Sequence, residues 1–103
     1  MAIVYRVKTT DGAGGRLAVR RAMSHMHTGC ASAGAYRIGP DSASMGWTFF
    51  TLSIDDALEE AIGAKFADMI RRYRGKAHEK LDSFMSDYLE SRGSNVRISR
   101  ADA

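Results

Sequence analysis

Residues 46–60 of the chain read GWTFFTLSIDDALEE, a strand pattern that runs directly into the start of a helix. Between Gly46 and Ile54, aromatic, β-branched and apolar residues fall on both alternating faces. This pattern predicts a strand that is central in a sheet or that exposes one face for binding. Ser53 can cap the following helix, with Asp56 three residues further on, as in a capping box. The acidic residues that open this segment favour the positive end of a helix dipole.

The helix after this strand, which is the second one expected in the chain, is predicted to continue to about Glu90. Gly93 is expected to end it by adopting a left-handed backbone conformation. Over residues 55–90 it would be roughly 54 Å long at ~1.5 Å per residue, longer than strands of ~20–30 Å. Its apolar stripe turns by about a quarter of a circle near Gly75, where glycine and like charges four residues apart weaken a helix. The sequence leaves open whether the helix breaks at Gly75.

Beyond Gly75 the predicted helix carries large apolar side chains that need a partner surface, since burial of each is worth about 1.5–3 kcal/mol. A fold-back on the same domain or a second copy of the chain would provide that surface. Because the core is so small, we expect a homodimer or a larger homo-oligomer. The predicted oligomer interface consists of Leu81, Phe84, Met85, Tyr88 and Leu89.

The beginning of the chain alternates apolar and basic residues over 2–9, which is typical of a strand. The Gly-rich stretch 10–15 is expected to break the chain as a turn. Apolar residues then recur at helical spacing, which favours a helix over about 15–28. A hairpin in which Leu17 and Val19 pair back onto the first strand remains the alternative.

The remaining segments complete an α+β pattern. Small side chains predict a mobile connection over 28–34, a short strand follows at 35–38, Gly-Pro-Asp-Ser predicts a turn at 39–42, and Asn95–Ser99 is expected to form the last strand. The order strand, helix, strand, strand, helix, strand is that of a ferredoxin-like split βαβ domain with an extended second helix. The alternative is an antiparallel sheet of hairpins packed on one long helix.

Length and composition restrict the class of protein. The 103 residues, 11.3 kDa, 45% hydrophobic and 26% charged, predict one small globular domain over 1–99 with a frayed tail at 100–103. The longest apolar stretch is far below the roughly 20 residues of a membrane span, and the N-terminus lacks a signal-peptide core. Cys30 is the only cysteine and cannot form an internal disulfide. These features favour a cytoplasmic protein without membrane association.

The charge distribution fits contact with an anionic partner, although a net charge this small is also ordinary for a soluble domain and favours a solvated surface. The net charge is +3 and the pI is about 9.3, with six basic and two acidic residues in the first 54 positions. In the second half the bases crowd between Arg71 and Lys80, although helical geometry wraps them around the helix. Two aromatic residues of the central strand could stack on unpaired bases if that face is open. The predicted contacts with a partner or with nucleic acid are Arg71, Arg72, Arg74, Lys76, Lys80, Trp47 and Phe49.

Two further groups of residues are candidates for an anion site and a metal site, but their sequence patterns are less specific. A candidate anion site between the first strand and helix consists of Gly14, Gly15, Arg16 and Arg20. The residues His25, His27 and Cys30 are of types that bind zinc or copper, but on a helix the two histidines point about 200° apart. No metal or other cofactor is therefore predicted. The chain also lacks a motif that would bring a nucleophile, a base and oxyanion donors together, so we do not expect an enzyme.

These observations favour a small binding protein that acts stoichiometrically through protein–protein contacts. Accessory, regulatory and inhibitor proteins, including those encoded by phages and mobile elements, belong to this class. The alternative is a basic nucleic-acid-binding protein that uses Arg16, Arg20, Arg21 and the 71–80 cluster. The sequence does not identify the partner.

Overall fold

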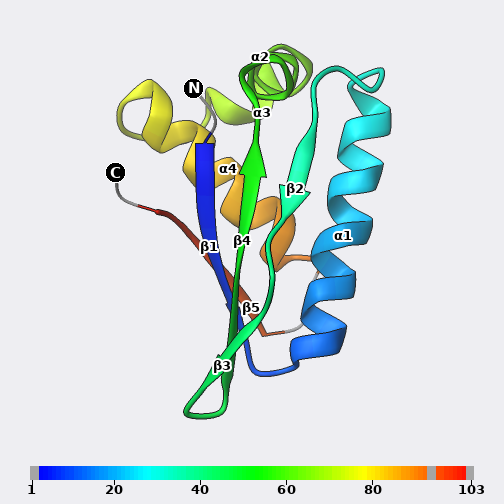
Figure 1. Cartoon of the computed structure of the whole chain (residues 1–103). Coiled ribbons are helices and arrows are strands. Elements are labelled where there is room, and N and C mark those ends of the chain that lie inside the picture. The colour runs from blue at the N-terminus through cyan, green and yellow to red at the C-terminus, as the bar shows by residue number, and fades with distance from the viewer. Residues whose placement is uncertain (1–2, 93–94, 102–103) are drawn as a thin grey trace.

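A computed structural model of the chain describes residues 3–92 and 95–101 (Figure 1). The elements in chain order are β1 (Ile3–Thr9), α1 (Gly12–Gly29), β2 (Tyr36–Ile38), β3 (Ser42–Ser44), β4 (Trp47–Ile54), α2 (Asp56–Lys65), α3 (Ala67–Ile70), α4 (Ala77–Glu90) and β5 (Val96–Arg100). In the described part of the chain, no helix is long and apolar enough to cross a membrane.

The strands form one antiparallel sheet in the order β2-β4-β1-β5, and β3 extends the pairing of β4. The two central strands are β1 and β4. Their register places Tyr5 of β1 opposite Leu52 of β4 on one side and opposite Arg100 of β5 on the other. The predicted small α+β domain, with an antiparallel sheet and helices, is therefore confirmed.

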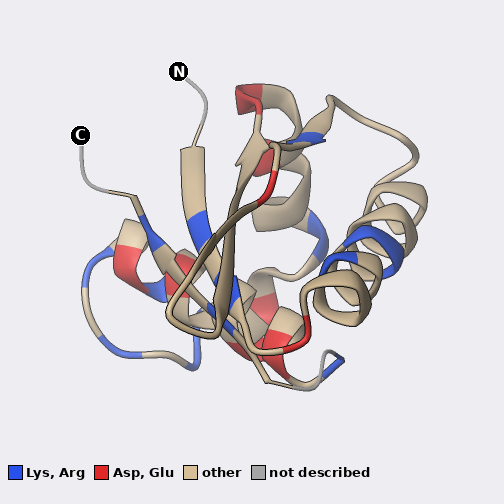
Figure 2. Ribbon diagram, turned by 60° about the horizontal axis from the view of Figure 1, so that its bottom comes forward, with Lys and Arg blue, Asp and Glu red and all other residues tan. Residues whose placement is uncertain are grey.

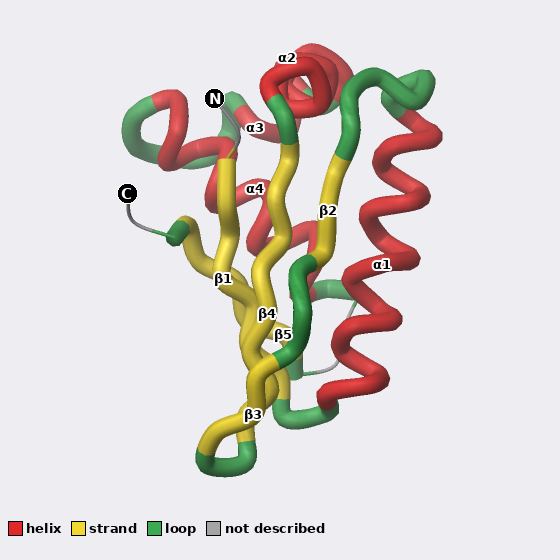
Figure 3. The backbone as a smooth tube through the Cα atoms, viewed as in Figure 1, coloured by secondary structure: helices red, strands yellow, loops and turns green. Residues whose placement is uncertain are grey.

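The helices and the core lie on one face of the sheet. Figures 1 and 3 look onto the opposite face, with the strands in front and α4 behind them. The buried residues of the central strands point toward the helices and alternate with exposed residues on the viewer's side. In β4, Phe50, Leu52 and Ile54 are buried, while Phe49 is 39% exposed. The strand with two apolar faces is thus central and also open on one side.

The first helix begins three residues earlier than its apolar spacing predicted. Asp11 caps it by accepting a hydrogen bond from the amide of Gly14 (3.1 Å), so the Gly-rich stretch is the first turn of α1 and not a loop. Gly15 is buried against β1, where an added Cβ would lie 2.5 Å from Thr9 Oγ1. The glycines therefore permit close helix–sheet packing. The hairpin alternative was wrong, because Leu17 and Val19 both lie within α1.

The predicted single helix over 55–90 was wrong, because the segment forms three helices. Asp55, and not Ser53, caps α2, since its side chain accepts the amide of Leu58 (2.9 Å). The chain leaves helical geometry before Gly75, whose φ of +105° lies in the left-handed region, and α4 then crosses behind the sheet. The helix therefore folds back onto its own domain and does not overhang the sheet. The predicted stop at Gly93 lies outside the described residues.

The second half of the sheet also differs from prediction at two boundaries. The predicted turn at 39–42 is a short interruption between β2 and β3, and the hairpin turns instead at Met45 and Gly46, both with positive φ. This β3–β4 hairpin extends beyond the rest of the sheet (Figure 3). The last strand includes Arg100, so the predicted frayed tail was wrong at that residue. Residues 102 and 103 lie outside the described ranges.

Candidate nucleic-acid interface

The uncovered face of the sheet presents side chains from all five strands. We call it the open face and define it from the strand register as Val4, Arg6, Lys8, Arg37, Ser42, Ser44, Trp47, Phe49, Thr51, Ser53, Arg97 and Ser99. Cross-strand pairs place Lys8 between Phe49 and Arg97, and Arg6 between Thr51 and Ser99. Cations from β1 and β5 therefore lie next to the aromatic residues of β4.

The open face has one sign of charge. It carries four cations, and the strands as the structure bounds them contain no Asp or Glu. Figure 2 shows the acidic residues on helices and connections. Within the described ranges, Arg6, Lys8 and Arg37 have no ion-pair partner. Arg97 is 4.0 Å from Glu90 Oε1, too long for a strong hydrogen bond. Arg6, Lys8 and Arg37 are therefore available to an anion, whereas Arg97 also donates a hydrogen bond to the carbonyl of Val96 (3.1 Å).

Phe49 and Trp47 lie on the same face but differ in accessibility. The Lys8 ammonium lies 5.0 Å from the centroid of the Trp47 ring, a cation–π contact that occupies one side of the indole. Phe49, in the middle of the face, is 39% exposed, a large fraction for an aromatic side chain at the centre of a sheet. Phe49 is therefore the aromatic surface that a planar group can reach without displacing another side chain.

Two hollows flank Phe49. The hollow toward β5 has a volume of about 280 Å³ and is lined by Arg6, Val7, Lys8, Phe49, Arg97, Ile98 and Ser99. The hollow toward β3 has a volume of about 480 Å³ and is lined by Arg6, Val7, Pro40, Ser42, Phe49, Phe50 and Thr51. Phe49 and Arg6 belong to both hollows. The open face is thus a basic surface with two depressions around one aromatic ring.

The predicted 71–80 cluster lies elsewhere. Arg71, Arg72 and Arg74 are exposed on the connection between α3 and α4, where Arg71 pairs with Asp68 (3.0 Å). This connection lies on the left of Figure 1, whereas α1, with its arginines, lies on the right. The fold therefore separates the α1 arginines from the 71–80 cluster, so the two groups do not share one surface.

The candidate anion site is occupied by contacts within the chain. Arg16 donates through one guanidinium nitrogen to the carbonyl of Gly39 and to Asp41 Oδ1, both at 2.6 Å. The amide of Gly14 is bonded to the side chain of Asp11, and the amide of Gly15 donates to the Asp11 carbonyl. These donors fix the start of α1 to the β2–β3 edge. The amides of Gly14 and Gly15 and one guanidinium nitrogen of Arg16 are therefore engaged within the chain, whereas Arg20 is exposed, and phosphate binding at this site stays a prediction.

The predicted oligomer interface belongs to the core of the chain. Leu81, Phe84, Met85, Tyr88 and Leu89 are all buried by the fold-back of α4. Phe84 packs against Phe66 (5.0 Å between ring centroids) and against Tyr88 (5.9 Å). The surface that these side chains needed is the chain's own sheet and α3, so their use as an interface was a wrong prediction.

The histidine and cysteine residues do not come together as ligands. A ring nitrogen of His27 lies 2.9 Å from the carbonyl oxygen of Gly34, and the ring meets Tyr36 edge-on. His25 is exposed, whereas Cys30 is buried, and burial raises the pKa of its thiol. Among the described residues, no group of three His, Cys, Asp or Glu side chains could hold a metal ion.

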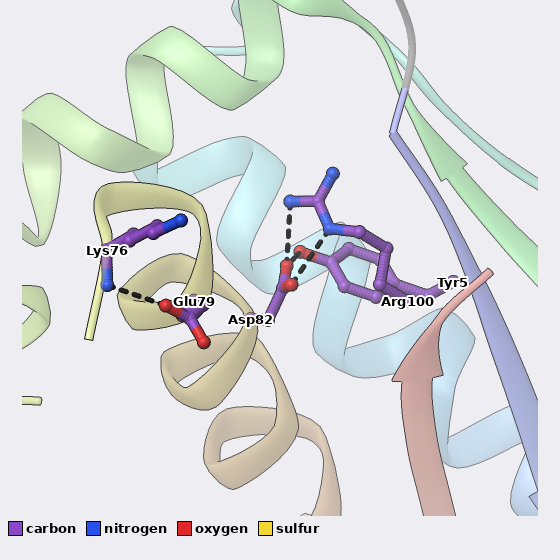
Figure 4. A network of polar contacts seen from close by, with 5 residues as sticks. All are labelled: Tyr5, Lys76, Glu79, Asp82 and Arg100. Atoms are coloured by element: carbon purple, nitrogen blue, oxygen red, sulfur yellow. Dashed lines mark hydrogen bonds and ion pairs between the residues drawn. The ribbon is translucent and has the colours of Figure 1, made fainter. Parts of the chain in front are cut away.

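A polar network that the sequence analysis missed joins β1, β5 and α4 (Figure 4). Arg100 donates two hydrogen bonds of 2.8 Å to the carboxylate of Asp82, and the hydroxyl of Tyr5 donates a third at 2.8 Å. Burial and then the Asp82 carboxylate raise the pKa of Tyr5 well above its usual range, so the phenol stays protonated. The network lies on the helix side of the sheet and fixes β5 to α4.

The four cations of the open face were also missed as a group, although the sequence contains a signal for two of them. Arg6 and Lys8 alternate with the buried Tyr5 and Val7, so a strand must present both on one face. The contributions of Arg37 and Arg97 depend on which strands become neighbours, and the sequence pattern does not determine that pairing.

No protein-family model matches the chain, and no curated protein gives a match. Among solved structures, the chain resembles a de novo designed protein, Foldit4, with a TM-score of 0.50 and 11% sequence identity. The alignment covers 99% of this chain and 96% of the designed one. This likeness concerns the fold alone.

Proposed function

We propose that the protein binds single-stranded nucleic acid on the open face of its sheet. The observation that carries the proposal is the exposed ring of Phe49 beside the cations Arg6, Lys8 and Arg97, with Arg37 further along the same face, on strands without acidic residues. Cations neutralise backbone phosphates, and an exposed aromatic ring stacks on a base of any sequence. The proposal keeps Trp47 and Phe49 from the sequence analysis and replaces the 71–80 cluster with the strand cations.

A single strand fits this surface better than a duplex does. Base faces are stacked inside a duplex, whereas the bases of a single strand can turn outward and lie on an aromatic side chain. The hollows beside Phe49 provide space for such a base. An open β-sheet is one of the platforms on which proteins bind unpaired bases in this way.

We also propose that the fold is a variant of the ferredoxin-like split βαβ arrangement. The strand order β2-β4-β1-β5, with antiparallel neighbours throughout and helices between β1 and β2 and between β4 and β5, supports this assignment. The differences are the interruption that separates β2 from β3 and the division of the second helix into three.

The test is a titration of fluorescently labelled oligothymidylate of 12 nucleotides, followed by anisotropy at 50 and 200 mM salt. We expect binding that weakens with salt, with a slope of about −2 to −3 for three to four phosphate contacts on a single strand. Phe49→Ala should weaken binding roughly 5- to 100-fold, since stacking on an aromatic is worth about 1–3 kcal/mol per base.

Two matched variants complete the experiment. Phe49→Tyr retains the ring and should bind nearly as well as the original chain, whereas the triple variant of Arg71, Arg72 and Arg74 to Ala should have a small effect. Absence of binding at 50 mM salt would contradict the proposal. Equal affinities for the original chain and Phe49→Ala would also contradict it.

A second candidate function, contact with a protein partner, is favoured by a groove on the helical side. The groove between α2 and α4 has a volume of about 490 Å³, and Ile70, Ala77 and Leu81 contribute apolar surface to it. Glu59 and Glu60 lie on its rim. An apolar floor beside acidic side chains complements a basic amphipathic segment of another protein.

This candidate is tested by titrating a designed Lys/Leu amphipathic helical peptide and following the amide resonances of Gly63 and Ala77. We expect shifts confined to the groove, which are lost when Glu59 and Glu60 are both replaced by Gln. Unchanged resonances at millimolar peptide would eliminate the groove as a partner site.

A further inference from the structure

The two hollows of the open face differ in chemistry, although they share one wall. Three of the residues around the β5-side hollow are cations, namely Arg6, Lys8 and Arg97. The β3-side hollow has Arg6 as its only cation, and its other lining residues are apolar or carry hydroxyl groups. Phe49 separates the two hollows, so one aromatic ring has a cationic side and a largely apolar side.

These two environments match the two parts of a nucleotide. A phosphate is held by converging cations and gains little from an apolar wall. A base is flat and largely apolar, and it gains from contact with an aromatic ring and with an apolar residue such as Pro40. Each part has its better environment in a different hollow.

We propose that Phe49 divides the open face into a phosphate site and a base site, so that a nucleotide lies across the strands in one orientation. Its phosphate lies over β1 and β5, between Arg6, Lys8 and Arg97, and its base lies against Phe49 in the β3-side hollow. Arg6 reaches both sites and contacts the phosphate at the junction. This inference rests on the proposed function and adds the direction in which the ligand lies.

Register supports this orientation. Lys8 pairs with Phe49 across β1 and β4 and with Arg97 across β1 and β5, so the three side chains form a row across the strands. The row consists of Arg97 on β5, Lys8 on β1 and Phe49 on β4, and neighbouring strands are about 4.8 Å apart. The distance across three strands is comparable to the span from a phosphate to its base.

The experiment compares two probes of equal length, oligothymidylate and an abasic deoxyribose-phosphate oligomer, in binding to the full chain. Substitutions at the phosphate site, Lys8→Ala and Arg97→Ala, should weaken both probes by the same factor and reduce the salt slope by about 0.7 each. Substitutions at the base site, Phe49→Ala and Ser42→Leu, should weaken oligothymidylate roughly 5- to 100-fold and change abasic binding about twofold at most.

The substituted positions are all exposed, so the variants should fold, and Arg21→Ala on α1 is the matched control for loss of one exposed cation. The proposed orientation is overturned if Phe49→Ala weakens both probes equally, or if Lys8→Ala and Arg97→Ala affect only the probe that carries bases. The proposed function itself fails in a different way, when oligothymidylate does not bind or when Arg21→Ala is as harmful as the open-face variants.

Discussion

Asp82 is the acceptor at the centre of the network that fixes β5 to α4. It takes hydrogen bonds from Tyr5 and twice from Arg100, and its side chain is only 24% exposed. Asp82→Asn removes the negative charge and leaves the Arg100 guanidinium without its counterion. Because hydrogen bonds to charged groups contribute about 1.5–3 kcal/mol, we expect the free energy of unfolding to fall by about that amount.

Urea denaturation of Asp82→Asn beside Asp87→Asn measures this effect. Asp87 is exposed and accepts one hydrogen bond from Tyr73 (2.6 Å), so its replacement should cost about 1 kcal/mol or less. If the two variants lose equal stability, the network does not hold the strand.

The stability of the fold depends on pH through the carboxylate of Asp55. The amide of Leu58, a further backbone hydrogen bond from Ala35 and the nearby His27 hold the pKa of Asp55 below its usual range. A lowered pKa in the folded state means that the carboxylate stabilises the fold above its unfolded pKa. This contribution disappears as the pH falls through the folded pKa, in the range below about pH 4.

We therefore expect Asp55→Asn, which retains a capping oxygen, to reduce the fall in stability between pH 5 and pH 2.5. The measurement is a series of urea unfolding curves across that range for the original chain, Asp55→Asn and the control Asp68→Asn. An unchanged dependence on pH in Asp55→Asn would show that the cap does not couple to protonation.

For single residues, the sequence showed which side chains could bind a ligand, but it did not show which of them are engaged in contacts within the chain. It identified Trp47 and Phe49, because an aromatic pair on an alternating strand is visible without tertiary contacts. It did not show that Arg16 is engaged, because the carbonyl of Gly39 and the carboxylate of Asp41 that it binds are 23 and 25 positions away. Contacts of that separation depend on the fold and not on local pattern.

The connection between α3 and α4 depends on Gly75, whose φ of +105° is costly for any residue with a Cβ. An added Cβ would also lie 3.0 Å from the side chain of Glu79, which caps α4 by accepting the amide of Lys76. Gly75→Ala should therefore destabilise the fold by about 1–2 kcal/mol.

Gly63 is the matched control. It lies within α2 and has no neighbour within 4 Å of an added Cβ, so Gly63→Ala should stabilise the fold by about 0.8–1 kcal/mol through helix propensity. Thermal unfolding of both variants gives the comparison. Equal changes of the same sign would contradict the left-handed turn at Gly75.

Elements with a regular local pattern were predictable, while those shaped by tertiary contacts were not. The apolar spacing of α1 and the alternation of β1 and β4 gave the correct type of element, with errors of a few residues at the ends. The second helix was predicted to continue to about Glu90, because every part of it has helical spacing, with a break at Gly75 left open. Its division follows from Phe66, Phe84 and Tyr88 packing together, which only the folded chain brings about.

The molecule as a whole has one covered and one uncovered side of its sheet. The helices supply the core on one side, and with α4 folded back, its large apolar side chains are already buried. The side without helices keeps the charged and aromatic residues. Our account of function depends on this division, because it places the cations and Phe49 on one continuous surface.

The most direct test of this account is a map of amide chemical shifts in the ¹⁵N-labelled chain during titration with oligothymidylate at low salt. We predict that the shifted amides belong to β1, β4 and β5 around Arg6, Lys8, Phe49 and Arg97, and that α1 and the 71–76 connection stay unchanged. Shifts centred on α1 or on that connection would contradict the claim that the open face is the binding surface, as would a titration that moves no resonance.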